Sequence, residues 1–123
     1  MIEFKPSESE KISELLGKDH INDNYIAYTA FESGEEVGNC VCFSENTFVK
    51  IVFLDFSDSK PYIGEGLIKS ALNFAAGKGA YITVCSADIK GNHPLPFGFN
   101  FTNGEYTGEI PEILMAVSYT HLT

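Results

Sequence analysis

Residues 46–78 constrain the fold of this chain more than any other stretch, because their hydrophobic period changes across a short loop. Residues 48–56 are mostly β-branched and aromatic, which is typical of a central strand that is covered on both faces. Residues 57–61 are small, polar and proline-containing, which predicts a loop. From Gly64 onward, apolar residues recur at three- and four-residue spacing, so we predict an amphipathic helix that ends near Gly77.

Strands and hairpins are predicted on both sides of this stretch. The strand at residues 48–56 and the helix after it are followed by another strand at residues 80–86. This order requires the two strands to pair in parallel through a right-handed crossover. Turn residues at 33–35 and at Asn103-Gly104 predict two hairpins. The other expected elements are a strand at 1–5, a helix at 8–16, and strands at 25–32, 36–44, 99–101 and 105–109. We therefore expect an α/β (α+β) fold, with a mixed central sheet flanked by helices.

The length and charge of the chain narrow the class of protein. At 123 residues, 44% of them apolar and 20% charged, the chain is expected to form one globular domain over residues 1–116. Its formal net charge of −9 argues against nucleic acid or an anionic membrane as a partner, because both require clustered positive charge. We find no signal peptide and no run long enough to span a membrane, so we expect a cytoplasmic protein.

Two glycines stand at the start of the predicted helix, and two roles are open for them. Gly64 and Gly66 would let the backbone curl and bring a ligand close to bare N–H groups. The first turn of a helix has unpaired donors and a partial positive charge, which suits an anion such as phosphate. The alternative is that the glycines only permit tight packing of the helix on the strand. The spacing of two glycines favours neither role.

This part of the chain resembles the acyl-CoA-binding core of the GNAT (acyl-CoA N-acyltransferase) superfamily. The shared order is a strand, a loop, the motif x-x-x-G-x-G, an amphipathic helix and a second strand, followed by Gly98-Phe99. The resemblance covers residues 46–99. The family signature is Q/R-x-x-G-x-G/A, opening the helix after the fourth strand. Gly64 and Gly66 match it, whereas Pro61 stands where the Gln or Arg should be, with Lys60 as the nearest cation.

The resemblance implies that the chain uses acetyl-CoA as a cosubstrate and transfers the acetyl group to an amine. The acceptor would be a small-molecule or peptide amine, and a homodimer is left open. The backbone of the central strand would pair with the pantetheine amides, and the turn before the helix would hold the pyrophosphate. The residues that it assigns to cofactor binding are Leu54, Phe56, Tyr62, Ile63, Gly64, Glu65, Gly66 and Leu67.

Asp55 is the candidate catalytic base, because it is the only carboxylate in the central strand and acetyl transfer needs a group that takes the amine proton. It either faces the cleft or lies at a bulge on the polar edge of the strand. Tyr28 and Glu32 could border the acceptor site, although solvated strand residues are the simpler interpretation. His20 and His93 have no second ligand at metal spacing, so we expect no metal site.

After residue 86 the sequence departs from the family pattern. A typical member has a helix here that delivers a tyrosine to the thiol of CoA, but residues 92–97 hold two prolines and no tyrosine. This difference supports an alternative function, a catalytically degenerate GNAT-fold module for acyl-CoA binding or interaction. A third interpretation is an α/β interaction domain that binds no CoA and uses the glycines only for packing.

The C-terminus and the cysteines carry further expectations. Residues 117–122 resemble the translation of a sequencing adapter, so we expect 117–123 to be a non-native tail and the native chain to continue beyond about Met115. The final strand of the family would then be missing, and one sheet edge would be left unpaired, which promotes self-association. Cys40, Cys42 and Cys85 are expected to be buried and reduced.

Overall fold

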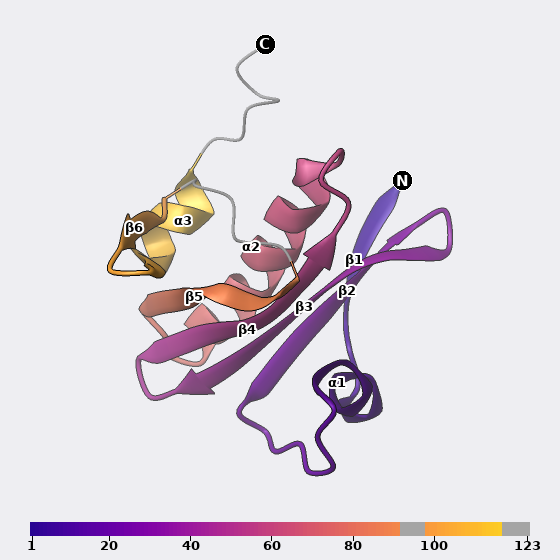
Figure 1. Ribbon diagram of the computed structural model, residues 1–123, viewed down its shortest axis with the longest axis horizontal. Coiled ribbons are helices and arrows are strands. Elements are labelled where there is room, and N and C mark those ends of the chain that lie inside the picture. The colour runs from indigo at the N-terminus through magenta and orange to yellow at the C-terminus, as the bar shows by residue number, and fades with distance from the viewer. Residues whose placement is uncertain (92–97, 117–123) are drawn as a thin grey trace.

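One seven-stranded sheet forms the centre of the molecule within the part of the chain that is described. The structure is a computed structural model, and it describes residues 1–91 and 98–116. The strand order is β1-β2-β3-β4-β5-β7-β6, with α1 on one face and α2 and α3 on the other (Figure 1). The elements are β1 Ile2–Pro6, α1 Ser9–Leu16, β2 Tyr25–Glu32, β3 Glu35–Glu45, β4 Phe48–Phe56, α2 Pro61–Gly77, β5 Ile82–Gly91, β6 Asn100–Thr102, β7 Glu105–Glu109 and α3 Ile110–Met115. The predicted mixed sheet flanked by helices is confirmed.

Two-residue turns join antiparallel strands, as the turn residues predict. Ser33 and Gly34 connect β2 to β3 with φ angles of 53° and 85°. Asn103 and Gly104 connect β6 to β7 with φ angles of 53° and 79°. Positive φ at both central residues matches the right-handed twist of the flanking strands, which favours Gly and Asn there. Both predicted hairpins are confirmed.

β7 lies between β5 and β6 and pairs antiparallel with both. The expectation that the final strand is missing is therefore wrong, because the tight turn after β6 folds the next residues back beside β5. β7 covers the edge of β5 from Ile82 to Ser86. The chain then enters α3, where the Ile110 N–H donates to the Tyr81 carbonyl at 2.8 Å. The sequence analysis did not predict α3.

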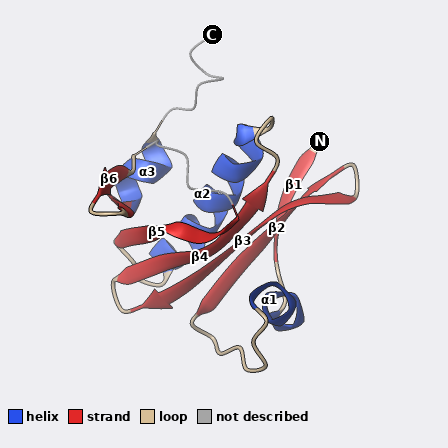
Figure 2. Cartoon of the chain, in the orientation of Figure 1, coloured by secondary structure: helices blue, strands red, loops and turns tan. Residues whose placement is uncertain are grey.

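α2 begins at Pro61, earlier than the predicted start at Gly64. Proline suits the first helical position because its fixed φ is helical and its missing N–H would be unpaired there. The segment expected to form a turn is therefore helix, and Figure 2 shows α2 as a continuous helix behind the sheet. β4 and β5, on either side of α2 in the sequence, pair in parallel, as predicted.

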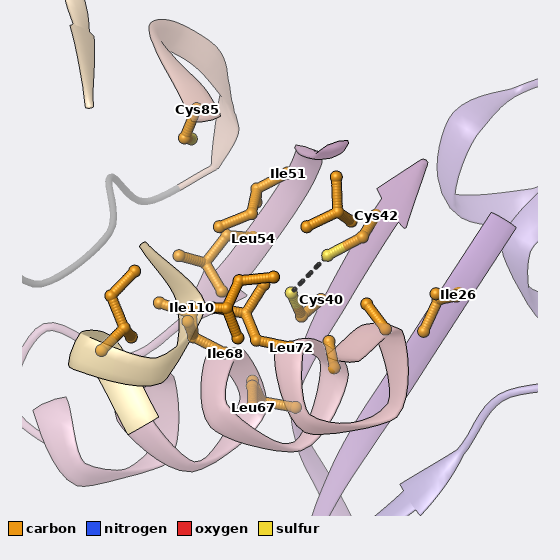
Figure 3. Close-up of a cluster of buried hydrophobic side chains, with 14 of the residues drawn as sticks. Ile26, Cys40, Cys42, Ile51, Leu54, Leu67, Ile68, Leu72, Cys85 and Ile110 are labelled. Carbon is orange, nitrogen blue, oxygen red and sulfur yellow. Dashed lines mark hydrogen bonds between the residues drawn. The ribbon is translucent and has the colours of Figure 1, made fainter. Parts of the chain in front are cut away.

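The larger core lies between the sheet and α2, with α3 beside it (Figure 3). Leu67 and Leu72 of α2 are fully buried in it. Cys40 and Cys42 also lie there, with their sulfur atoms 3.9 Å apart, and Cys85 joins them from β5. All three cysteines are free and buried, which confirms the prediction for them.

A smaller core lies between α1 and the opposite face of the sheet, which we call the α1 face. Ile12 of α1 packs there with Ala27, Val41 and Phe53 from three strands. Gly17 ends α1 in the left-handed conformation, at a φ of 67°, as its position after the helix predicts. Among the described residues, no helix has the length and apolar character needed to cross a membrane.

Candidate functional site

β4 contains a bulge at Val52 that divides the strand into two halves. Toward β3, Val52 falls between two register pairs, Ile51 with Cys42 and Phe53 with Val41, and has no partner of its own. Toward β5, Val52 again stands outside the register. An extra residue of this kind bends a strand and re-aims the side chains that follow it.

The bulge turns Asp55 away from the larger core. Before the bulge Val49 and Ile51 are buried under α2, and after it Leu54 and Phe56 face the same core. Because side chains alternate along a strand, Asp55 would share the face of Ile51 if the bulge were absent. Asp55 is instead exposed on the α1 face.

β5 loses its register with β4 beside this bulge. The register shifts between the pair Ile51–Cys85 and the pair Phe53–Lys90, and the last register pair joins Leu54 to Gly91. The strand edge that the sequence analysis assigned to the cosubstrate is therefore already covered at Leu54. The register between β4 and β5 ends at Leu54, so Asp55 lies just beyond the last register pair.

Aromatic rings of the protein itself occupy the space beside the two glycines of α2. A Cβ atom at Gly64 would lie 2.4 Å from the ring of Phe56, at the end of β4. A Cβ atom at Gly66 would lie 2.1 Å from the ring of Phe4, in β1. Both distances are far below van der Waals contact, so glycine lets the helix lie this close to the sheet. This geometry supports the packing role, and cofactor binding at Gly64 and Gly66 stays a prediction.

The first turn of α2 presents an aromatic side chain and lies beside a paired lysine. Tyr62 is 42% exposed. Lys60, which precedes the helix, donates to Glu32 at the end of β2 at 3.0 Å, and this hydrogen bond raises the pKa of Lys60. Glu65 forms an ion pair with Lys69 one turn later, also at 3.0 Å. The Ile63 N–H donates to the Lys60 carbonyl at 3.0 Å, and anion binding by the first-turn backbone stays a prediction.

A row of polar side chains crosses the α1 face beside Asp55. Thr29 lies opposite Asn39, and Asn39 lies opposite Asp55, in neighbouring strands. Residues that face each other across strands project from the same side of a sheet. Thr29 and Asn39 are only 5% and 4% exposed, so Asp55 is the solvent-accessible end of the row.

Hydrogen bonds connect this row to α1. Ser7 Oγ lies 2.7 Å from Thr29 Oγ1, which donates to Asn39 Oδ1 at 2.8 Å. Asn39 Nδ2 donates to Glu36 Oε2 at 2.8 Å, and Lys11 Nζ donates to Glu36 Oε1 at 2.7 Å. The hydrogen bond from Lys11, and then that from Asn39, lowers the pKa of Glu36. Sequence reasoning missed this network, although Thr29 and Asn39 break the apolar alternation of their strands and the hairpin turn sets their register.

The other predicted site residues lie apart from Asp55. Tyr28 packs at the edge of the larger core, on the face opposite Asp55. His20 lines an open hollow beside α1, and His93 lies outside the described residues. No group of three or more His, Cys, Asp or Glu side chains in the described ranges could hold a metal ion. The fully buried members of the predicted set are Leu54, Ile63 and Leu67.

This arrangement of sheet and helices matches solved acetyltransferase structures. An aminoglycoside 6′-acetyltransferase type Ii superimposes with a TM-score of 0.60 at 21% identity, over 82% of this chain and 76% of that chain. An acetyltransferase of the GNAT family from Staphylococcus aureus Mu50 superimposes with a TM-score of 0.59 at 9% identity, over 89% and 99% of the two chains. The chain has the GNAT fold. No family profile and no curated protein sequence matches it.

Larger proteins share the GNAT fold over part of their length. The chain spans 43% of the aminoglycoside 6′-N-acetyltransferase from Enterococcus faecium, with a TM-score of 0.51 at 21% identity over 62% of this chain. It spans 42% of an aminoglycoside 6′-N-acetyltransferase complexed with coenzyme A, with a TM-score of 0.50 at 21% identity over 62% of this chain. At such identities, these likenesses establish the GNAT fold.

Proposed function

We propose that this protein transfers an acetyl group from acetyl-CoA to an amine. The observation that carries the proposal is the position of Asp55. The bulge at Val52 leaves this carboxylate exposed on the α1 face, just beyond the last register pair with β5 and near the end of the strand that leads into α2. The reaction needs a proton acceptor for the amine, strand backbone for the pantetheine amides and a helix N-terminus for the phosphates. A protein with the same fold has been crystallised with coenzyme A, which supports this cosubstrate.

The cosubstrate would lie along the end of β4 and the first turn of α2. The backbone of Asp55, which follows the last register pair between β4 and β5, would pair with the pantetheine amides. The pyrophosphate would sit at the helix N-terminus, where the exposed ring of Tyr62 would cover it. Gly64 and Gly66 would serve the site indirectly, since they let α2 approach the sheet.

The reaction would be a direct attack of the amine nitrogen on the thioester carbonyl. A C–N bond forms, the C–S bond breaks, and the sulfur leaves with the electron pair and takes a proton from solvent. Asp55 would accept the proton that the nitrogen loses, directly or through a water molecule. Because the sequence lacks the family's tyrosine at 92–97, thiolate departure would have no such acid, which costs about 10²–10⁴-fold. We therefore expect turnover below the roughly 10 s⁻¹ of a median enzyme.

A module that binds acyl-CoA without turnover is the second candidate function. Pro61 favours it, because proline supplies neither the side chain of the family's Gln or Arg nor a backbone N–H for the phosphates. Lys60, the nearest cation, is held by Glu32. In such a module Asp55 would have no chemical role.

Calorimetric titration with acetyl-CoA, followed by a thiol-release assay over a panel of amines, tests both functions. We expect acetyl-CoA to bind and amine-dependent thiol release to be slow. Asp55→Asn should lower kcat/KM by about 10²-fold or more and leave acetyl-CoA affinity unchanged. The matched control Asp23→Asn, at an exposed loop position, should change neither. Binding without release would select the second candidate, and absence of binding would exclude both.

A further inference from the structure

Within the described residues, one half of the sheet carries no helix on the α1 face. The smaller core under α1 takes residues from β2, β3 and β4, and none that is described from β5 or β7 (Figure 1). Val49 and Ile51 face the larger core, so Lys50 between them faces the other way, together with its register partners on the neighbouring strands. We call the following two rows the open face: Phe43, Lys50, Val84 and Thr107, and beside them Phe48, Ile82 and Glu109.

The open face is largely apolar. Phe48 is 37% exposed, and Phe43, Ile82 and Val84 are half-buried by their neighbours in the sheet. Exposed apolar side chains that adjoin one another indicate an interaction surface, whereas single scattered ones need no explanation. Contact with a second protein surface would remove these side chains from water, which is favourable.

Lys50 is exposed on this apolar surface, and its ammonium has no ion-pair or hydrogen-bond partner in the part of the chain that is described. The other lysine side chains that the structure describes each contact a carboxylate or an aromatic ring, and they are Lys5, Lys11, Lys18, Lys60, Lys69 and Lys78. An ammonium among apolar side chains is matched best by a surface that brings a carboxylate to it. Lys50 therefore restricts the kind of partner that fits the open face.

A hollow of about 250 Å³ beside β7 fits a lysine side chain. It is lined by Ile82, Asn100, Thr107, Gly108, Glu109 and Glu112. Glu109 accepts a hydrogen bond from the Tyr81 hydroxyl at 3.1 Å, and a carboxylate has acceptor sites on both oxygens, so it can take a second donor. The methylene stem of a lysine could lie against Ile82 while its ammonium reaches Glu109.

Lys50 and this hollow lie on opposite sides of β5. Lys50 is one strand away on β4, and Glu109 is one strand away on β7, in the next row. The midpoint between them falls on β5, between Ile82 and Val84. A two-fold axis through this point, in the plane of the interface, places Lys50 of each copy over Glu109 of the other. The same rotation brings Phe48 of each copy close to Ile82 of the other, so the open face is complementary to itself.

We propose that the open face binds a second copy of this chain in a two-fold symmetric dimer, in which each Lys50 enters the hollow at Glu109 of the other copy. The open face supplies the apolar surface, the cation and the carboxylate at matching positions, and an unrelated partner would have to provide all of them. The open face is smaller than the roughly 20–30 residues that each side of a standard interface contributes, so we expect a weak dimer with a dissociation constant of about 10–100 µM.

This dimer is independent of the proposed reaction. Asp55 follows the bulge, near the end of β4 that is opposite to Phe48, so it stays outside the open face. Loss of the dimer and loss of acetyl transfer are therefore separate outcomes.

Sedimentation velocity of the full chain in 150 mM sodium chloride, at concentrations from about 5 to 500 µM, tests the dimer. Lys50→Glu replaces two symmetric ion pairs with two like-charge contacts, so it should weaken association by at least about 100-fold. The matched control is Lys5→Glu, which makes the same charge change on the edge strand β1 and should leave the dissociation constant unchanged. A native chain that stays monomeric over this range, or equal weakening by the two variants, would overturn the proposal.

An exchange of charges tests the contact between Lys50 and Glu109 itself. Glu109→Lys alone should weaken association as much as Lys50→Glu does, because it also creates two like-charge contacts. The combination of Lys50→Glu and Glu109→Lys should restore the native dissociation constant to within about threefold. Circular dichroism checks that each variant is folded. A double variant that stays monomeric while folded would overturn the proposal, since the two residues would then not meet across the interface.

Discussion

Gly66 illustrates how a single residue can leave two interpretations open in the sequence. Two glycines at a helix start are compatible with ligand approach and with packing, and both depend on what lies opposite. The structure supplies the missing partner, the ring of Phe4 from the first strand of the sheet. This contact joins distant parts of the chain, so no local pattern could predict it.

A double-mutant cycle at Gly66 and Phe4 tests the packing role. Gly66→Ala alone should lower the free energy of unfolding by about 1–3 kcal/mol, because the new methyl group displaces the Phe4 ring. With Phe4→Ala in place, the same change should cost little, since alanine favours a helix over glycine. Urea unfolding measures this coupling. Acetyl-CoA affinity should be equal in Phe4→Ala and in the double variant; a large loss in the double variant would show that a ligand needs bare backbone at Gly66.

Cys85 predicts how stability responds to alkaline pH. Burial raises the pKa of the Cys85 thiol to about 12, whereas an unfolded cysteine has a pKa of about 8.5. The unfolded state loses its proton first, so the contribution of Cys85 is complete below about pH 8.5 and declines toward pH 12 by up to about 1.4 kcal/mol per pH unit. Urea unfolding of the native chain and of Cys85→Ala between pH 8 and pH 10 should show a shallower decline in the variant. Identical slopes would contradict this assignment.

Among the elements, the hairpin turns and the end of α1 were predicted from local chemistry, whereas the bulge in β4 and the helix α3 were not. The hairpins follow from turn residues with positive φ, and α1 ends where Gly17 permits the left-handed conformation. The bulge in β4 could not be found in this way, because Val52 and Phe53 are both apolar and hide the change of face between them. α3 was missed because it is only six residues long and follows a strand directly.

Deletion of Val52 tests whether the bulge sets the faces of β4. A continuous register would turn either Leu54 and Phe56, or Val49 and Ile51, out of the larger core, so the variant should lose about 5 kcal/mol or more and fail to fold stably. Val52→Ala keeps the register and should cost only about 1 kcal/mol. Circular dichroism and urea unfolding compare the two. A deletion variant as stable as Val52→Ala would show that the register slips without cost.

At the scale of the whole molecule, the sequence predicted the class of fold but not how the sheet is completed. The strand–helix–strand unit is local enough to predict a parallel pair. The position of β7 between β5 and β6 depends on which strand edge it pairs with after the turn. Only the assembled sheet determines which edge is open to it, so the local sequence could not predict this pairing. The net charge of −9, in contrast, needs no structure and acts on every ligand that approaches.

Opposite salt dependences should therefore distinguish the two substrates of the proposed reaction. Acetyl-CoA carries phosphates and is repelled by a protein with a net charge of −9, so its KM should fall as salt rises from 10 to 150 mM. A positively charged amine is attracted, so its KM should rise over the same range, because the Debye length shortens from about 30 Å to about 8 Å. Steady-state kinetics in sodium chloride measure both, and sucrose at matched osmolality is the control. A change of both constants in one direction would contradict this account.

The bulge at Val52 also has a consequence for protein engineering. In a strand without a bulge, regular alternation fixes the face of every side chain. The packing of residues at the start of such a strand therefore also determines which face a residue at its end occupies. In β4 the bulge shifts the alternation of faces after Ile51. Asp55 is therefore exposed on the α1 face, apart from the larger core. A library that varies Asp55 together with Asn39 would therefore explore new chemistry while the core built on Val49 and Leu54 stays constant.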